Sequence, residues 1–237
     1  MFQTGPSQTG TPQTTGTPAN GSRLRGFAQR AASRAAGAAA APVEEKCELC
    51  SAPIAPEHRH MLDLSARRIL CACRACSVLF DRSESGGRHY RLLPDRCWRL
   101  EDVALGDELW MALGIPVEMA FFFFDSAAAR IVALYPSPAG ATESLLPLDA
   151  WEELAARNPV LARMEPDTEA LLVNRTRGAR EHWLVPVDVC YALVGIIRTH
   201  WKGLSGGEEV WAEIERFFDG LRERAEAGRS DGVEARA

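Results

Sequence analysis

Residues 47–76 of the sequence read CELCSAPIAPEHRHMLDLSARRILCACRAC. This stretch opens with the pair Cys47 and Cys50 and closes with the pair Cys73 and Cys76. Two residues separate the cysteines of each pair, so each short loop can point two thiolates at one centre. Two such loops complete a tetrahedron around one ion, as in closed structural zinc sites. We therefore predict one metal ion per chain, held by these four cysteines, and assign it to Zn²⁺.

Iron is the alternative metal, because a tetrathiolate site can hold either ion. Rubredoxin-type iron loops usually carry glycine directly after the second cysteine, whereas this chain carries Ser51 and Ser77. Glycine reaches positive φ angles at little cost and serine does not, so the sequence favours zinc. An iron–sulfur cluster fits less well, because the run from Cys71 to Cys76 matches neither common ferredoxin spacing.

Three further side chains in this stretch could contact the metal. Cys71 stands two residues before Cys73, so the two face the same side of an extended strand. Cys71 is either a thiol beside the ligands or one that exchanges with Cys73. His58 and His60 also share one strand face; they are surface residues, hydrogen-bond donors to the ligands, or ligands where a cysteine is absent. The sequence leaves these three roles open.

Residues 43–94 form the predicted metal module. Short strands are expected on both sides of a turn at Ser65 and Ala66 and again after the turn-forming residues 83–87. The expected strands are 58–64, 68–72, 78–80 and 89–93. Cysteine loops interleaved with short antiparallel strands are typical of a zinc ribbon or a rubredoxin-like unit.

Residues 95–226 form a predicted small mixed domain, which makes the fold class α+β. Two antiparallel hairpins are expected, and the unbroken apolar run 121–124 predicts a strand covered on both faces. The hairpins pair 117–124 with 130–135 and 170–174 with 182–185. Helices are expected at 100–113, from Asp149 to before Pro159, at 188–201 and, amphipathic, at 207–224.

The composition of the chain indicates which disordered segments, partners and cellular locations are expected. The tails 1–42, rich in Arg and Ala in their second half, and 227–237 are expected to be disordered because they have little to bury. A net charge of -5 argues against nucleic-acid binding, and no apolar run reaches the ~18 residues of a membrane helix. Seven cysteines, clustered and odd in number, suit metal ligation in a reducing cytoplasm better than disulfides.

Motifs of catalysis are missing from the sequence. It holds no P-loop, no GxGxxG and no nucleophile elbow. Cys190 and His200 are ten residues apart on one expected helix, roughly 15 Å along its axis, and so form no local dyad. We expect a protein that is not an enzyme; an enzyme with an unidentified pocket in the α+β domain is the second alternative, after an iron electron-transfer protein.

Several stretches together resemble an uncharacterised actinobacterial family, a domain of unknown function. They are CELC, PEHRHMLDL, CACRAC, LGIPVEMAFFFF, YPSPAGATESLL and CYALVGIIRTHWKGLSGGEEVW. Members of that family tend to be encoded beside high-affinity NiFe uptake hydrogenases. The resemblance implies an accessory protein whose partner is a hydrogenase subunit or maturation factor. It carries over no catalytic residue, and it supports as functional only the two cysteine pairs.

Overall fold

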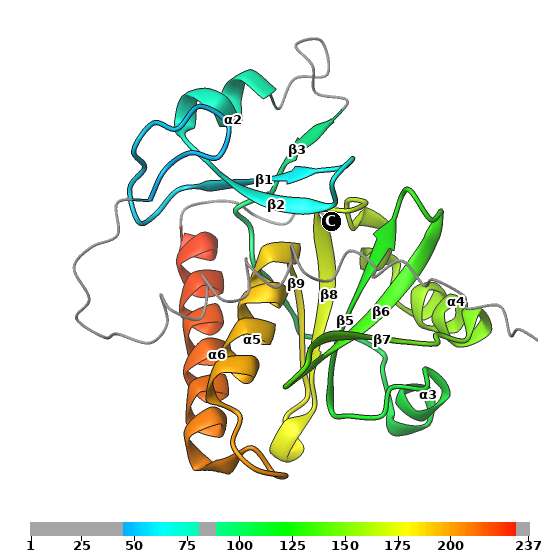
Figure 1. Ribbon diagram of the computed structural model, residues 1–237. Coiled ribbons are helices and arrows are strands. Elements are labelled where there is room, and N and C mark those ends of the chain that lie inside the picture. The colour runs from blue at the N-terminus through cyan, green and yellow to red at the C-terminus, as the bar shows by residue number, and fades with distance from the viewer. Residues whose placement is uncertain (1–44, 81–88, 231–237) are drawn as a thin grey trace, which may run out of the picture.

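The computed structural model describes residues 45–80 and 89–230 and has the predicted α+β architecture. Its described strands form two antiparallel sheets, a six-stranded one in the order β4-β9-β8-β5-β6-β7 and a three-stranded one in the order β2-β1-β3. The smaller sheet, with one short helix, lies across one end of the larger sheet (Figure 1). The cysteine pairs belong to this smaller part, which we call the metal module.

Helices cover both faces of the six-stranded sheet. The strands are β4 (Trp98–Leu100), β5 (Met119–Asp125), β6 (Arg130–Ser137), β7 (Gly140–Ser144), β8 (Glu169–Asn174) and β9 (Glu181–Pro186). One face packs on α5 (Val187–His200) and α6 (Gly207–Ser230), the other on α3 (Asp107–Ala112) and α4 (Leu148–Arg157) (Figure 1). Two short 3₁₀ helices, Pro159–Arg163 and Thr176–Gly178, complete the connections.

Strand β5 shows why this part of the sequence reads as a continuous apolar run. Successive side chains of a strand point to opposite faces. Phe121 belongs to the core beneath α5, where its ring lies 5.8 Å from that of Tyr191. Phe122 belongs to the opposite core, where its ring stacks 5.6 Å from that of Trp151. The predicted double coverage of 121–124 is therefore confirmed.

The metal module consists of β1 (Arg59–Asp63), β2 (Arg68–Ala72), β3 (Tyr90–Leu92) and α2 (Arg74–Phe80). Ile69 and Leu93 are buried in the same apolar cluster as α5 and α6, so the module shares a core with the larger sheet. Arg67 adds an ion pair to Asp125 at the end of β5, with an N–O distance of 2.6 Å.

Most expected elements are present near their expected bounds, but one strand of the metal module was wrong. Residues 78–80, predicted as a strand, end helix α2 instead. The physical reason is the second cysteine pair. To bring Cys76 back beside Cys73 the chain turns, and the Ser77 N–H then donates to the Cys73 carbonyl at 2.9 Å, an i to i−4 bond that starts a helix.

The helix predicted at 100–113 was also too long, because only Asp107–Ala112 is helical. Its first residue, Leu100, is instead the last residue of β4, which pairs with β9 in the register Trp98 with Leu184. Strand β7 was not anticipated; it adds to the edge of β6. Strand β4 depends on a partner far away in the chain, and β7 depends on backbone pairing with β6. Short sequence patterns reveal neither of these.

The expected tail 1–42 lies outside the described residues, as do residues 231–237 of the expected tail 227–237; α6 continues to Ser230. Among the helices of the described ranges, none combines the length and the apolar character that crossing a membrane requires.

Candidate metal centre

The first cysteine pair lies in a tight loop before β1. The Ser51 N–H donates to the Cys47 carbonyl and the Cys47 N–H to the Ala52 carbonyl, both at 2.8 Å, which folds the loop back on itself. Ser51 occupies the position where rubredoxin-type loops usually have glycine, and its φ is +63°. The loop therefore needs the left-handed conformation at this point, and serine adopts it at some cost.

The second pair spans the end of β2 and the first turn of α2. Cys73 follows the strand directly, and Cys76 is the third residue of the helix. The Cys76 N–H points at the Cys73 sulfur at 3.4 Å. The Glu48 N–H donates to the Cys71 carbonyl at 2.9 Å, which fastens the first loop to the end of β2. The two loops are thus not equivalent, because one is an irregular turn and the other opens a helix.

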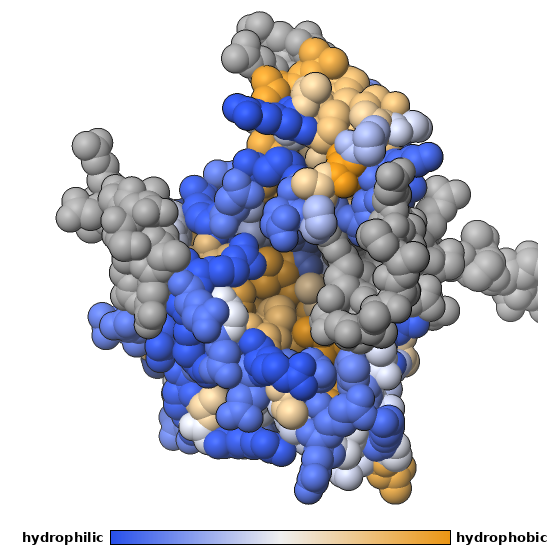
Figure 2. All heavy atoms as spheres, turned by 90° about the vertical axis from the view of Figure 1, so that its left-hand side faces the viewer, coloured by the Kyte–Doolittle hydropathy of each residue, from blue (hydrophilic) through white to orange (hydrophobic). Residues whose placement is uncertain are grey.

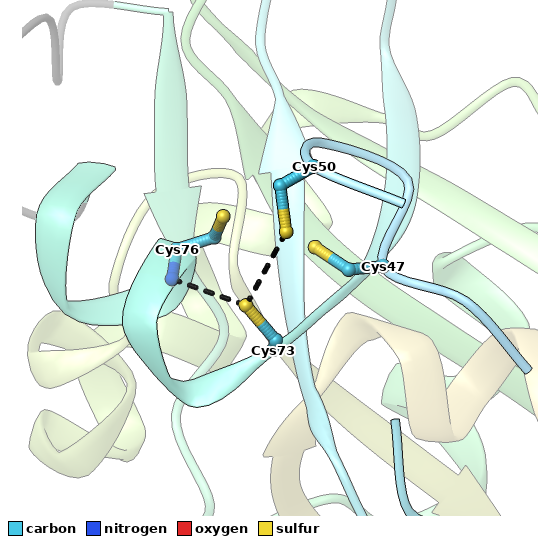
Figure 3. Close-up of side chains that lie close together, drawn as sticks. All are labelled: Cys47, Cys50, Cys73 and Cys76. Atoms are coloured by element: carbon cyan, nitrogen blue, oxygen red, sulfur yellow. Dashed lines mark hydrogen bonds between the residues drawn. The ribbon is translucent and has the colours of Figure 1, made fainter. Parts of the chain in front are cut away.

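The structure brings all four predicted ligands together. Their sulfur atoms lie within 4.8 Å of one another and point toward a common centre (Figure 3). The Sγ atoms of Cys50 and Cys73 are 3.7 Å apart. In a tetrahedron with Zn–S bonds of ~2.3 Å the sulfur atoms stand ~3.8 Å apart, so the observed separation fits one four-coordinate ion. Cys47 and Cys76 are buried, Cys73 is half-buried and Cys50 is exposed.

The four thiols do not ionise alike. Burial raises the pKa of Cys47, but hydrogen bonds from the backbone of Cys73, Cys50 and Leu49 outweigh it and lower that pKa to about 6. Burial and the neighbouring thiols raise the pKa of Cys76. The group thus holds one thiolate readily and resists further negative charge until a cation supplies the balance.

Positive side chains near the site have other partners. Arg67 is bound to Asp125 of the larger sheet. Arg68 lies 3.7 Å from the Glu48 carboxylate, within the first loop. The charge of a tetrathiolate centre would therefore be balanced chiefly by the ion and by backbone N–H groups.

Cys71 lies outside the four-thiol group. Its sulfur belongs to a second group with the imidazoles of His58 and His60, whose ligand atoms also lie within 4.8 Å of one another. His60 bonds through Nδ1 to the Asp188 carboxylate at 2.6 Å. Burial lowers the pKa of His60, but Asp188 and Cys71 outweigh it and raise that pKa to about 9. Asp188 lies 128 residues from His60 in the chain, so no local motif links the two.

The other two cysteines belong to the core. Cys190 on α5 is fully buried, and burial raises the pKa of its thiol well above the usual range. Cys97 is buried beside it in the same apolar cluster, and burial raises its pKa to about 11. His200, at the far end of α5 from Cys190, bonds to Glu209. Cys190 is therefore a small core residue.

The sequence matches the family of unknown function DUF5947 over residues 46–225, and the chain belongs to that family. No curated protein and no solved structure matches the chain.

Proposed function

We propose that this member of a family of unknown function is a zinc-binding accessory protein that recognises a protein partner through its metal module. The observation that carries the proposal is the convergence of four thiols at the spacing of a tetrahedral site. Four protein ligands leave no coordination position for a substrate, and such closed sites stabilise small folds that lack a sufficient core. The role of the ion is then to hold the first loop against α2.

The surface beside the four cysteines supports a binding role. Val78 and Leu79 follow the ligand Cys76 on α2 and are more than half exposed. A groove of about 650 Å³ runs between this helix and the first loop, with Ile54 and Leu92 in its lining. In Figure 2 apolar side chains gather over the metal module, whereas polar side chains cover most of the same face below it. Apolar patches rimmed by polar residues commonly bind other proteins.

The partner that we propose is a subunit or maturation factor of a NiFe hydrogenase, on the strength of the resemblance described above. The metal module would present its groove and α2 to that partner, while the larger sheet supports the module from below. The proposal makes the protein non-enzymatic.

Replacing Cys50 and Cys76 together by serine tests the metal site. Metal content of the natively expressed protein, measured by inductively coupled plasma mass spectrometry, should fall by one ion per chain. An unchanged metal content in this variant would show that the four cysteines do not hold the ion.

Replacing Val78 and Leu79 by serine tests the binding surface. Both side chains are exposed, so the variant should fold and keep its metal, yet it should no longer co-purify a hydrogenase component from its own host. The matched control is Leu204→Ser, because Leu204 is fully exposed in the turn between α5 and α6. A V78S/L79S variant that captures the partner as well as L204S does would remove the surface from consideration.

The second candidate is electron transfer by iron, because the same four thiolates suit a rubredoxin-like centre. Visible absorption distinguishes the zinc proposal from the iron proposal, because a ferric tetrathiolate is red and a zinc site is colourless. A purified protein that is coloured and titrates reversibly in a redox experiment would replace the zinc proposal with the iron one.

A further inference from the structure

A second cluster of metal-ligating side chains lies on the metal module, away from the four cysteines. It consists of His58, His60 and Cys71, each of which offers one ligand atom within 4.8 Å of the other two. Strand pairing creates it. His60 is the direct partner of Cys71 in the β1–β2 register, and side chains of paired residues lie on the same face. His58, two residues before His60, adds its ring to that face, with the ring centroids 4.9 Å apart.

The Nδ1 atom of each imidazole already has a hydrogen-bond partner. His58 bonds through Nδ1 to the Ala55 carbonyl at 2.9 Å, which makes Nδ1 the donor and leaves Nε2 with a free lone pair. That Nε2 is buried and meets no hydrogen-bond partner in residues 45–80 and 89–230. His60 bonds through Nδ1 to Asp188 at 2.6 Å. Metal-bound histidines almost always have their second nitrogen held by a carbonyl or carboxylate in this way.

The three side chains lie in an enclosed place, where protein atoms would surround a bound ion and shield it from bulk water. The His58 side chain is 4% exposed, and Cys71 is buried. A thiolate at Cys71 and the carboxylate of Asp188 would balance the two positive charges of a divalent ion in this enclosed place. Binding would displace the protons of the thiol and of His60, as metal binding to thiols and imidazoles does in general.

We propose that His58, His60 and Cys71 form a second metal site that takes a zinc-class divalent ion, with Asp188 as the residue that positions His60. Two nitrogens and one sulfur are a donor set that zinc accepts. Three protein ligands leave one tetrahedral position for a water molecule or small anion, unlike the closed four-cysteine group. This inference does not rest on the proposed function, because its ligands are different side chains.

The position of Asp188 gives the site a structural consequence. Asp188 lies in the first turn of α5, whereas His60 lies in β1 of the metal module. An ion on His60 would hold the imidazole in place for its hydrogen bond to Asp188 and so connect the metal module to the central helix of the larger part. Loading of the second site is therefore expected to fasten the module in place.

The number of zinc ions per chain tests the proposal directly. Full-length protein, saturated with zinc and then freed of weakly held metal by gel filtration, should contain two ions per chain. His58→Gln and Cys71→Ser should each contain one, because both leave the four-cysteine group intact. The matched control is His89→Gln, an exposed histidine of the same module that bonds to Ser65 at 3.1 Å and should leave two ions. One ion per chain in the unchanged protein, or two in H58Q and C71S, would overturn the second site.

Two further measurements guard against variants that misfold. Asp188→Asn keeps the shape of the side chain and should weaken zinc binding at one site by about 10–100-fold in chelator competition, the usual effect of losing such an orienting group. Equal affinity in D188N and the unchanged protein would contradict the positioning role. In the C50S/C76S background, cobalt bound at the remaining site should show a single-thiolate absorption band that vanishes on adding C71S. A band that persists would show that Cys71 is not a ligand. These results separate the second site from the four-cysteine site, because either can fail while the other stands.

Discussion

Arg96 should be among the most costly residues to replace outside the metal module, because it neutralises a buried carboxylate. The Glu169 side chain is completely buried, and Arg96 holds it with two parallel bonds, Nε to Oε1 at 2.5 Å and a second guanidinium nitrogen to Oε2 at 2.9 Å. These bonds also raise the pKa of Arg96. Methionine at position 96 would keep the apolar stem and remove the charge.

The expected loss follows from the surroundings of Glu169. Removing one partner of a buried pair leaves an uncompensated charge and costs about 3–5 kcal/mol of unfolding free energy. Arg96 also lies over the Trp98 ring at 4.7 Å, a contact that contributes about 0.5–1 kcal/mol. After the substitution Glu169 retains the bond from the Glu165 N–H at 2.9 Å, so the lower part of the range is the better estimate.

Thermal and urea unfolding of zinc-saturated protein would measure this loss. A domain of this size loses roughly 2–4 °C per kcal/mol, so a loss of about 3–4 kcal/mol should lower the unfolding temperature of R96M by about 6–16 °C. The matched control is Arg130→Met, since Arg130 and Glu143 form a pair at 2.6 Å in which both side chains are about half exposed. Exposed pairs contribute only about 0.2–1 kcal/mol.

The double variant R96M/E169Q tests whether the uncompensated charge of Glu169 causes the loss of stability in R96M. Neutralising Glu169 removes the uncompensated charge, so this variant should be more stable than R96M alone. The reasoning is refuted if R96M is no less stable than R130M, or if the E169Q change in the R96M background brings no recovery.

Three further predictions concern separate parts of the fold. Burial, helped by two nearby arginines, lowers the pKa of His182 to about 4. Since the unfolded chain takes up this proton near pH 6.5, the free energy of unfolding should fall by about 2 kcal/mol, after solvent screening, as the pH drops from about 6.5 to 4. The H182Q variant should flatten that part of a pH profile measured by urea denaturation. Gly206 has φ +89°, and an added Cβ would lie 2.8 Å from Val210, so Gly206→Ala should lower the free energy of unfolding by about 2–3 kcal/mol in urea. Gly203→Ala should lower it by about 1 kcal/mol, because φ is +65° there but nothing lies within 4 Å of the added Cβ. Equal losses in the two variants would contradict the steric argument. Cys190, fully buried with a raised pKa, should resist iodoacetamide in the native protein and react after denaturation, as mass spectrometry of tryptic peptides would show; labelling of the folded protein would indicate that α5 opens readily.

Local patterns were enough to predict much of the architecture. The two hairpins of the larger sheet, the double coverage of 121–124 and the helices around 149 and 188 were all visible in apolar periodicity and turn residues. Such features arise from residues close together in the chain, whose spacing decides which face they occupy. The grouping of the four cysteines followed from the same logic, because a CxxC spacing fixes two thiols side by side.

The errors arose where distant segments decide the local structure. The strand expected at 78–80 is helical because Cys76 turns back toward Cys73, and residues 98–100 form a strand because β9 offers an open edge. Apolar residues in short runs fit either state, so the neighbour present in the fold decides between them.

The four-cysteine group, the α+β class and the strand with two buried faces could be predicted from the sequence, since each depends on spacing along a few residues. The convergence of His58, His60 and Cys71 is visible only in the folded chain. Their convergence depends on the register between β1 and β2, and the carboxylate that holds His60 comes from a helix 128 residues later in the chain. Register and docking are set by the burial of whole faces, as one residue of slippage would send every side chain of a strand to the opposite side. That information is distributed over the entire core and is not contained in any one motif.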